Sequence, residues 1–572
     1  MSAAILLFTA LLIRFIWPRK VPDVYWICPV LMFALPLSAG GFHTATTAVL
    51  TLFMTLALVE QVRPKGNLRI MVNPASAAVL ILFAAYCITP LWAADKGMAW
   101  FALPRYFPLV LYVLLIQQRD DDIQQQTLDI IPASGCIMTV VSILALLLPD
   151  LQSHVTVNGR LAGLFQYPNS FAAFLLIGLI VQSFRHPCRH HCLTSSLLVS
   201  GIVLSGSKTV FLLMIVFMVA IILSHRKLLP ALVLSIALIL GIAAGFLADS
   251  FGLLPNADRF TSIQVSSGTF LVRLLYFRDV IPFILTHPFG IGYMGYPAVE
   301  GLIQTGRYYV TYIHNGFLQI LLEVGWFPGL ILILLMVSAV FLSKTTVLHK
   351  FILLAVLSHC MLDFDLQFCV FWIILLSCLR LNFGREILVI PQKAAYCLSA
   401  VLVAVCLWLG SGDWLFRSQK SEHCLYVTPF HTEALAYELT DTENPDQLDR
   451  LADKILALNP THSLASSAKA NVAFSRGDIA TMIRYKEQAI QFSRYTTAEY
   501  CHYFDMLYTA MQLYLQTGDV SSAAYCRDKL LQIPEMMDSV SIETHFLAGL
   551  TGDDSSLLLP PEYQTILDSL SS

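Results

Sequence analysis

Four polar side chains stand in the otherwise apolar stretch "TYIHNGFLQILLEVGWFPG", and they are the first candidates for chemistry. Three of them, Asn315, Gln319 and Glu323, are spaced four residues apart, so on a helix they share one face. Such a polar stripe cannot point at lipid, and we expect Gln319 and Glu323 to hold neighbouring helices together. The fourth, His314, is predicted in the first helical turn, where the helix dipole disfavours the imidazolium. A neutral imidazole can accept a proton, as a general base must.

Four cations fall in segments that we predict on one side of a membrane: Arg160 in "NGRLAGLFQYPNSFAAF", Lys208 in "LSGSKTVFLL", and Arg273 and Arg278 in "FLVRLLYFRDVIPFILTHPFGIG". An unpaired charge near hydrocarbon costs roughly 2.5–3.5 kcal/mol, so it usually marks a ligand or a partner. The planar fork of arginine suits a pyrophosphate, whose oxygens it binds two at a time. The alternative is that these side chains only reach to lipid headgroups. Arg160 favours a site, because it shortly precedes a helix start at Pro168 and Asn169.

The composition indicates an integral membrane protein. Of 572 residues, 57% are hydrophobic and 13% are charged, whereas a soluble protein has about 25% charged residues. The apolar runs from Ala3 to about Trp408 are long enough to cross a hydrocarbon core of about 30 Å. We therefore expect an all-α, polytopic transmembrane helix bundle of about 12–14 spans. The predicted spans are 2–17, 24–40, 42–61, 74–92, 99–117, 129–148, 169–184, 193–206, 209–224, 229–248, 314–342, 351–362, 366–381 and 394–411.

Basic residues predict the orientation of this bundle. They stand in loops on one side: Arg19, Arg69, Arg226, Lys344 and Arg385. The positive-inside rule assigns that side to the cytoplasm, so both chain ends are expected outside. The same parity places 149–168, 205–209 and 249–312 on the outer face. Residues 351–381 could form one long helix, but the flanking charges favour two spans with Asp363 and Asp365 at an outer turn.

The sequence predicts neither a metal nor another cofactor. The cluster "HPCRHHC", residues 186–192, holds ligand types that zinc prefers, but its spacing fits no paired zinc motif. We interpret it as a basic cytoplasmic loop. The net charge of −3 gives no sign of a nucleic-acid partner.

Two domains are expected: a transmembrane domain over 1–411, with a large outer loop at about 249–313, and a soluble helical domain over 412–572. In the second, Gly477-Asp478 and Gly518-Asp519 each follow one amphipathic segment and precede another, about forty residues apart. That spacing exceeds the 34 residues of a tetratricopeptide repeat, but the helix-turn-helix pattern is the same. We predict a short, tetratricopeptide-like, extracytoplasmic helical-repeat domain.

Five segments in this order resemble the characteristic blocks of the O-antigen ligase and O-antigen polymerase superfamily: "GRLAGLFQYPNSFAAFLL", "LSGSKTVFLL", "RLLYFRDVIPFILTHPFGIGYMGY", "YIHNGFLQILLEVGWFPG" and "LSHCMLDFDLQF". The resemblance spans about 158–368 and implies a bacterial, multi-pass glycosyltransferase of the cytoplasmic membrane with its active site outside. Members move glycan from a polyprenyl-pyrophosphate carrier to an acceptor without a metal. Some carry an outer helical-repeat tail.

The resemblance also implies roles for individual residues. Arg160 and Arg273 match arginines of the first and third blocks, and His314 matches the histidine that the family is thought to use as base. The second block usually ends in Ser-Arg, whereas this chain has Lys208, which keeps the charge but loses the fork. Arg278 is an expected extra contact to the donor pyrophosphate. Support is expected from six further residues: Asn315, Gln319, Glu323, Asn169, Asp363 and Asp365.

The chemistry that fits these residues is an in-line displacement with inversion. Cations stabilise the departing pyrophosphate, and a neutral His314 removes the proton of the attacking hydroxyl. The expected partners are the lipid-linked glycan donor, a glycan, lipid or protein acceptor, membrane lipid and, through the tail, an envelope-assembly protein.

Three other functions stay open. The first is a polymerase of lipid-linked repeat units in place of a ligase, because the two share these blocks. A lipid-glycan flippase also needs outer cations, but it should show internal repeats, which we do not find. A metal-dependent glycosyltransferase could use Asp363 and Asp365 with His359, although we expect that segment to be a hydrogen-bonded turn.

Overall fold

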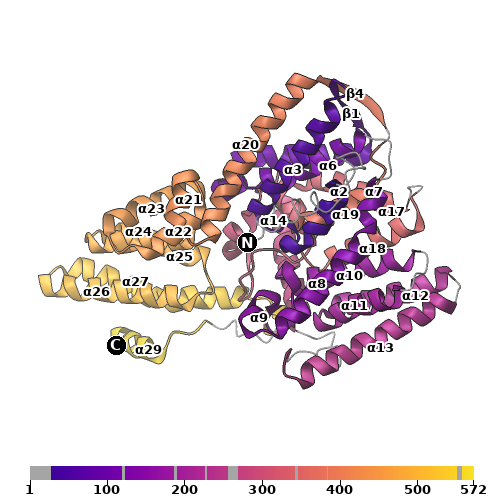
Figure 1. Ribbon diagram of the computed structural model, residues 1–572. Coiled ribbons are helices and arrows are strands. Elements are labelled where there is room, and N and C mark those ends of the chain that lie inside the picture. The colour runs from indigo at the N-terminus through magenta and orange to yellow at the C-terminus, as the bar shows by residue number, and fades with distance from the viewer. Residues whose placement is uncertain are drawn as a thin grey trace.

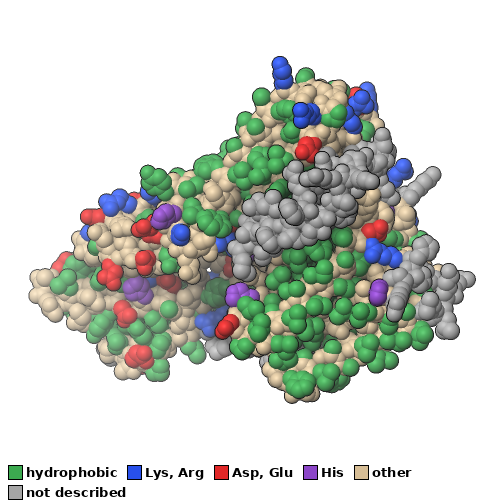
Figure 2. Space-filling view, in the orientation of Figure 1, with side chains coloured by type: hydrophobic (Ala, Val, Ile, Leu, Met, Phe, Trp, Pro, Cys, Tyr) green, Lys and Arg blue, Asp and Glu red, His purple; other side chains and the backbone are tan. Residues whose placement is uncertain are grey.

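The computed structural model describes residues 27–118, 123–185, 190–225, 228–254, 268–341, 345–382, 384–550 and 557–571. The predicted span 2–17 lies outside these ranges, as do residues 186–189 of the predicted basic loop. Apolar helices occupy the right of Figure 1, and the C-terminal helices α21 to α27 extend to the left. Side chains of Asp, Glu, Lys and Arg gather over the C-terminal helices in Figure 2, whereas the face beside them is mostly hydrophobic.

Six helical segments in the described ranges are long and apolar enough to cross a membrane: Thr44–Val62, Pro74–Leu91, Lys96–Gln117, Ile123–Leu146, Pro230–Ser250 and Gln392–Arg417. Shorter apolar helices stand between them. The principal helices of this region are α3 (Thr44–Val62), α4 (Pro74–Ile88), α6 (Ala102–Gln117), α8 (Ile131–Leu146), α10 (Pro168–Ser183), α11 (His191–Leu204), α12 (Lys208–His225), α13 (Leu228–Ser250), α17 (Trp326–Phe341), α18 (Val347–Cys360), α19 (Cys369–Ser377) and α20 (Gln392–Arg417). The expected polytopic helix bundle is confirmed. The predicted span 24–40 is a shorter helix, α2 (Ile27–Ala34), followed by a 3₁₀ segment, η1 (Pro36–Gly41).

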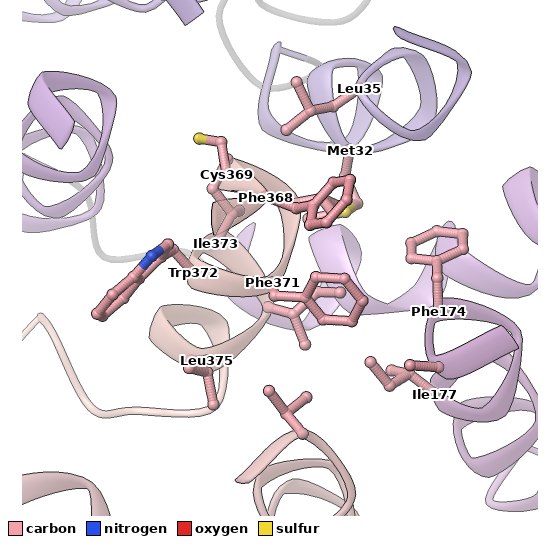
Figure 3. Packing of buried hydrophobic residues seen from close by; sticks show 14 of the residues in the cluster. Met32, Leu35, Phe174, Ile177, Phe368, Cys369, Phe371, Trp372, Ile373 and Leu375 are labelled. Atoms are coloured by element: carbon pink, nitrogen blue, oxygen red, sulfur yellow. The ribbon is translucent and has the colours of Figure 1, made fainter. Parts of the chain in front are cut away.

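Helix α19 lies at the centre of the apolar core, and its described side chains are buried. Figure 3 shows Phe371 of α19 pointing toward Phe174 and Ile177 of α10, while Trp372 lies on the opposite side of α19. This packing fixes the turn that precedes α19, where Asp363 lies.

At one end of the bundle, two segments far apart in sequence form a small antiparallel sheet. Strand β1 (Asn67–Val72) pairs with β4 (Arg385–Pro391), as the top of Figure 1 shows. The backbone of Arg69 also exchanges hydrogen bonds with the side chain of Gln118, at the end of α6. The loops that hold Arg69 and Arg385 therefore share one end of the bundle, as their predicted common side requires.

The predicted single span over 314–342 is wrong, because the chain breaks at Gly325. Helix α16 (Gly316–Val324) ends there, and α17 follows directly. The carbonyls of Leu322 and Glu323 accept hydrogen bonds from the backbone amides of Ile291 and Gly292, both at 2.9 Å. In a continuous helix these carbonyls would accept from residues four positions later. The crossing segment thus replaces the helical hydrogen bonds at the break.

Replacing Gly325 with alanine is expected to destabilise the protein. Gly325 has a φ of 93°, and a Cβ there would lie 2.2 Å from the carbonyl oxygen of Pro288. The strain alone costs about 1–3 kcal/mol, so the apparent melting temperature in detergent should fall. Gly329→Ala is the matched control, since the atom nearest to its Cβ would be Cδ2 of Leu321, the end of a flexible side chain, at 2.8 Å. Equal melting temperatures for Gly325→Ala and wild type would contradict this account.

The predicted outer loop at 249–313 contains two helices in its described part. They are α14 (Gly268–Thr286), which carries Arg273 and Arg278, and α15 (Gly295–Ile303). Residues 304–315 then lead to α16 without regular structure.

The C-terminal region is helical, and both predicted Gly-Asp turns are confirmed. Gly477 separates α24 (Ser463–Ser475) from α25 (Ile479–Phe492), and Gly518 separates α26 (Thr497–Thr517) from α27 (Val520–Glu543). Both glycines have a positive φ, and the aspartate after each caps the next helix. The remaining helices are α21 (Ser421–Val427), α22 (Thr432–Asp441), α23 (Pro445–Leu458), α28 (Phe546–Leu550) and α29 (Pro561–Ser571). Helix α20 continues through the predicted domain boundary at 411/412 to Arg417.

Candidate active site

The turn between α18 and α19 brings three of the predicted site residues, Asn169, Arg273 and His314, to Asp363. This buried carboxylate accepts hydrogen bonds from the Tyr167 hydroxyl (2.8 Å, Oδ1) and the Asn169 amide (2.7 Å, Oδ2). Arg273 Nη2 lies 3.4 Å from Oδ2, and His314 Nδ1 lies 3.3 Å from Oδ1. Segments distant in sequence thus place a phenol, an amide, a guanidinium and an imidazole on one carboxylate.

The surroundings of Asp363 keep its carboxyl group ionised. Burial by itself would raise its pKa, but the nearby Arg273 guanidinium and the hydrogen bond from His314 outweigh burial. They hold the pKa of Asp363 well below its usual range. The site therefore contains a permanent negative charge that orients its donors.

Arg160 joins this cluster through Asn169. It lies in β3 (Arg160–Leu161), which pairs with β2 (Thr156–Val157) in a short hairpin. Its Nη2 donates to Asn169 Oδ1 at 2.6 Å, and its Nε donates to the carbonyl of Ser205 at 2.8 Å. Asn169 therefore links Arg160 on one side to Asp363 on the other. The predicted helix start at Pro168 is confirmed, and it gives Asn169 this position.

His314 lies just before α16, so its predicted place in the first helical turn is wrong. Asn315 is the N-cap of α16, and its side-chain oxygen accepts hydrogen bonds from the amides of Phe317 and Leu318, both at 3.0 Å. His314 adopts a left-handed backbone with a φ of 56°, an uncommon conformation that is often found at functional sites. The contact with Asp363 and the start of α16 at the next residues therefore set the position and orientation of the imidazole.

The polar stripe on α16 is buried and pairs with other elements, as predicted. Gln319 donates to Glu323 Oε1 at 2.7 Å and accepts from the Ile313 amide at 3.0 Å. Glu323 Oε2 accepts from the hydroxyl of Tyr86 on α4 at 2.6 Å. Gln319 thus holds the residue before His314, and Glu323 attaches α16 to α4.

Asp365 forms a second, separate pair in the same turn. Its carboxylate accepts a hydrogen bond from Ser170 at 2.6 Å and contacts Nδ1 of the buried His359. Within the described ranges, no three His, Cys, Asp or Glu side chains form a group that could hold a metal ion. The protein's own donors surround Asp363 and Asp365, which agrees with the predicted hydrogen-bonded turn.

The other two predicted cations, Lys208 and Arg278, make none of the contacts to Asp363 described above. Lys208 begins α12, three residues after Ser205, whose carbonyl binds Arg160. Arg278 is bound elsewhere: its Nη1 lies 2.8 Å from Asp279 Oδ1 and 2.9 Å from Thr305 Oγ1. The structure does not bring Arg278 to Asp363.

The sequence analysis missed two residues at this site, Tyr167 and Arg105. Arg105 is 5% exposed, on α6, and donates to the carbonyls of Phe42 and Gln367, so it ties η1 to the turn that holds Asp363. An arginine within the apolar run "FALPRYFPLVL" was a signal, since charges inside membrane segments usually mark function. Tyr167 had no such signal, because a tyrosine at a membrane helix end is common.

A buried carboxylate, two arginines and an imidazole thus gather in an apolar helix bundle, and these are the side chains that a membrane enzyme acting on an anionic substrate would need. Residues 193–334, about a quarter of this multi-span helical membrane protein, match the model of the O-antigen ligase family. The matched range includes Lys208, Arg273 and His314, while Arg160 and Asp363 lie outside it. No curated protein matches the chain.

Proposed function

We propose that this protein transfers glycan from a polyprenyl-pyrophosphate carrier to an acceptor hydroxyl on the outer face of the bacterial cytoplasmic membrane, with inversion and without a metal. The gathering of Arg160, Arg273 and His314 around Asp363 and its partner Asn169 carries this proposal. The predicted orientation places this cluster and the C-terminal domain, residues 412–572, outside.

The arginines would bind the pyrophosphate of the donor. Arg273 and Asp363 are 3.4 Å apart, longer than a charge-assisted hydrogen bond of about 2.7–2.9 Å. We expect Arg273 to keep this contact through Nη2 and to bind phosphate oxygens with the rest of its guanidinium. Arg160 is held by Asn169 and Ser205 on the same network, and Lys208 stands at the next helix start. Positive charge at these positions would stabilise the departing pyrophosphate.

His314 would remove the proton from the acceptor hydroxyl. If Nδ1–H donates to the ionised Asp363, the lone pair of Nε2 remains to accept a proton. The resulting imidazolium is then stabilised by the same carboxylate. The attacking oxygen forms its bond to the anomeric carbon as the bond to pyrophosphate breaks, and no covalent enzyme intermediate is required.

Single alanine variants of Arg160 and Arg273 test the donor site. Loss of one charge-assisted hydrogen bond costs about 1.5–3 kcal/mol, so kcat/KM for the lipid-linked donor should fall about tenfold to hundredfold. The measurement is glycan transfer in proteoliposomes that contain purified protein and lipid-linked oligosaccharide.

Arg185→Ala is the matched control. Arg185 and Asp129 lie 3.4 Å apart, the same distance as Arg273 and Asp363, but their side chains are 35% and 45% exposed. An exposed ion pair contributes little. If both Arg160→Ala and Arg273→Ala transfer glycan like Arg185→Ala, the proposed donor site is wrong. A flippase would be favoured if the wild-type protein transfers no glycan and the arginine variants lose transport of the lipid-linked glycan.

Ligase and polymerase activities differ in the acceptor. The family match fits both activities; we propose the ligase function, with a polymerase of lipid-linked repeat units as the alternative. The length distribution of surface glycan in a deletion strain distinguishes them, because loss of a polymerase leaves single repeat units attached. We also propose that the C-terminal helices form a tetratricopeptide-like surface for the acceptor or an envelope-assembly protein, since concave helical repeats bind such partners.

A further inference from the structure

The C-terminal helices contact the segment that leads to His314. We call residues 298–313 the strap. Six strap residues bind the C-terminal region: Ala298 to Thr461, Gly301 and Leu302 to Arg494, Thr305 to His545, Arg307 to Tyr495, and Tyr309 to Thr496. A Cβ on Gly301 would lie 1.8 Å from the carbonyl oxygen of Phe492, so the two backbones are in direct contact. The region is thus packed on the strap from Ala298 to Tyr309.

Arg494 is the central contact. Its guanidinium donates to the carbonyls of Gly301 and Leu302 at the end of α15, and its third nitrogen pairs with Glu543 at 2.6 Å. Its side chain is only 20% exposed. One planar fork therefore joins α15 to two C-terminal helical segments.

The other face of the strap binds α14. Asp279, whose side chain is fully buried, accepts hydrogen bonds from the Thr305 amide (2.8 Å), the Thr305 hydroxyl (2.7 Å) and the Tyr308 hydroxyl (2.9 Å). Asp279 stands on the same helix as Arg273, six residues later. The strap thus lies between the C-terminal region and the helix that presents Arg273.

The strap ends directly at His314. Its last residue, Ile313, donates its amide to Gln319 at 3.0 Å, and the Val310 amide donates to Glu300 at 2.7 Å. The Tyr276 ring lies between the Tyr308 ring, 4.6 Å away, and the His314 ring, 6.0 Å away. A shift of the strap would therefore move His314 and disturb α14.

We propose that the C-terminal helices clamp the strap, and that Arg494 is a positioning residue for His314 and Arg273. This inference rests on the proposed function for its kinetic readout. The C-terminal region is then a part of the enzyme that completes the geometry of the site, in addition to any binding of partners. Misplacement of reacting groups by about 1 Å can cost about a hundredfold in rate, so such a clamp has a large effect on kcat.

The test compares Arg494→Ala and Arg494→Lys in the full-length protein. Arg494→Ala should lower kcat about 10- to 100-fold with little change in KM for the lipid-linked donor. Hydrogen exchange over the strap should accelerate while α24 to α27 stay protected. Lysine keeps the charge beside Glu543 but has one donor centre in place of the fork, so Arg494→Lys should recover part of kcat.

Arg476→Ala is the matched control, because Arg476 is a 50% exposed arginine of the same region whose partners are Asp446 and Asp449. Gly301→Ala changes the strap side of the contact, because its Cβ would clash with the carbonyl oxygen of Phe492. This variant should also release the strap. Wild-type kcat or wild-type strap exchange in Arg494→Ala overturns the clamp. If Arg494→Ala unfolds the C-terminal region, Arg494→Lys decides the test. Wild-type hydrogen exchange of the strap in Arg494→Lys then overturns the clamp. Absence of glycan transfer in wild type contradicts the proposed function, and strap exchange then decides the clamp alone.

Discussion

A His314→Gln protein is expected to lose about 10²- to 10⁴-fold in kcat, the usual contribution of a general base. Glutamine can still donate to Asp363, but it cannot accept the proton of the acceptor hydroxyl. Binding of the lipid-linked donor should change little, because the arginines that would hold the pyrophosphate stay in place. The rate is measured in single-turnover glycan transfer, with donor binding followed separately.

His287→Gln is the matched control for His314→Gln. His287 follows α14 on the same predicted side, and its Nδ1 lies 2.8 Å from the carbonyl of Phe283 in its own helix. Wild-type turnover in His314→Gln would show that His314 is not the general base. The residues around Asp363 would then remain only as an anion-binding site.

Asp363→Asn is expected to reduce kcat about 10²- to 10⁴-fold as well, although the residue touches no substrate in the proposed reaction. An amide can donate to His314 Nδ1, which favours the wrong tautomer and leaves Nε2 protonated. Arg273 also loses its counter-charge. Breaking a buried pair in this way typically costs about 3–5 kcal/mol, so this variant should also unfold at a lower temperature.

Stability against acid provides a second measurement for Asp363. Its pKa is lower in the folded protein than in the unfolded chain, so the ionised carboxylate stabilises the fold at neutral pH. This contribution is lost as the pH falls toward the lowered pKa, and it should be absent from Asp363→Asn. Asp129→Asn, which removes the exposed partner of Arg185, is the control. Identical acid unfolding of wild type and Asp363→Asn would contradict the assigned charge.

Local patterns in the sequence predicted the parts of the site that depend on neighbours along the chain. The spacing of Gln319 and Glu323 predicted a polar pair that faces neighbouring elements and not lipid, and Pro168 predicted the helix start that positions Asn169. The charges that flank 351–381 predicted two spans with Asp363 and Asp365 in the turn between them. Each of these inferences needs only a few consecutive residues.

Contacts between distant segments were beyond those patterns. Asp363 lies 90 residues from Arg273 and 49 from His314, so spacing could not show that the three meet. The break at Gly325 was missed for the same reason: hydropathy over 314–342 is continuous, and the segment that replaces the helical hydrogen bonds there comes from Ile291 and Gly292. Arg278 was grouped with the site cations by charge alone, whereas Asp279 and Thr305 hold it elsewhere.

The short helices beside Asp363 have a consequence for the lipid bilayer. At 1.5 Å per residue, the nine residues of α19 extend about 14 Å and the fourteen of α18 about 21 Å, against a hydrocarbon core of about 30 Å. The 26 residues of α20, by contrast, extend about 39 Å. If these two short helices cross the membrane as a pair, hydrophobic mismatch would thin the bilayer around the turn that joins them. The carrier lipid would then meet the enzyme where the bilayer is thinnest, with its charged headgroup already near the level of Asp363.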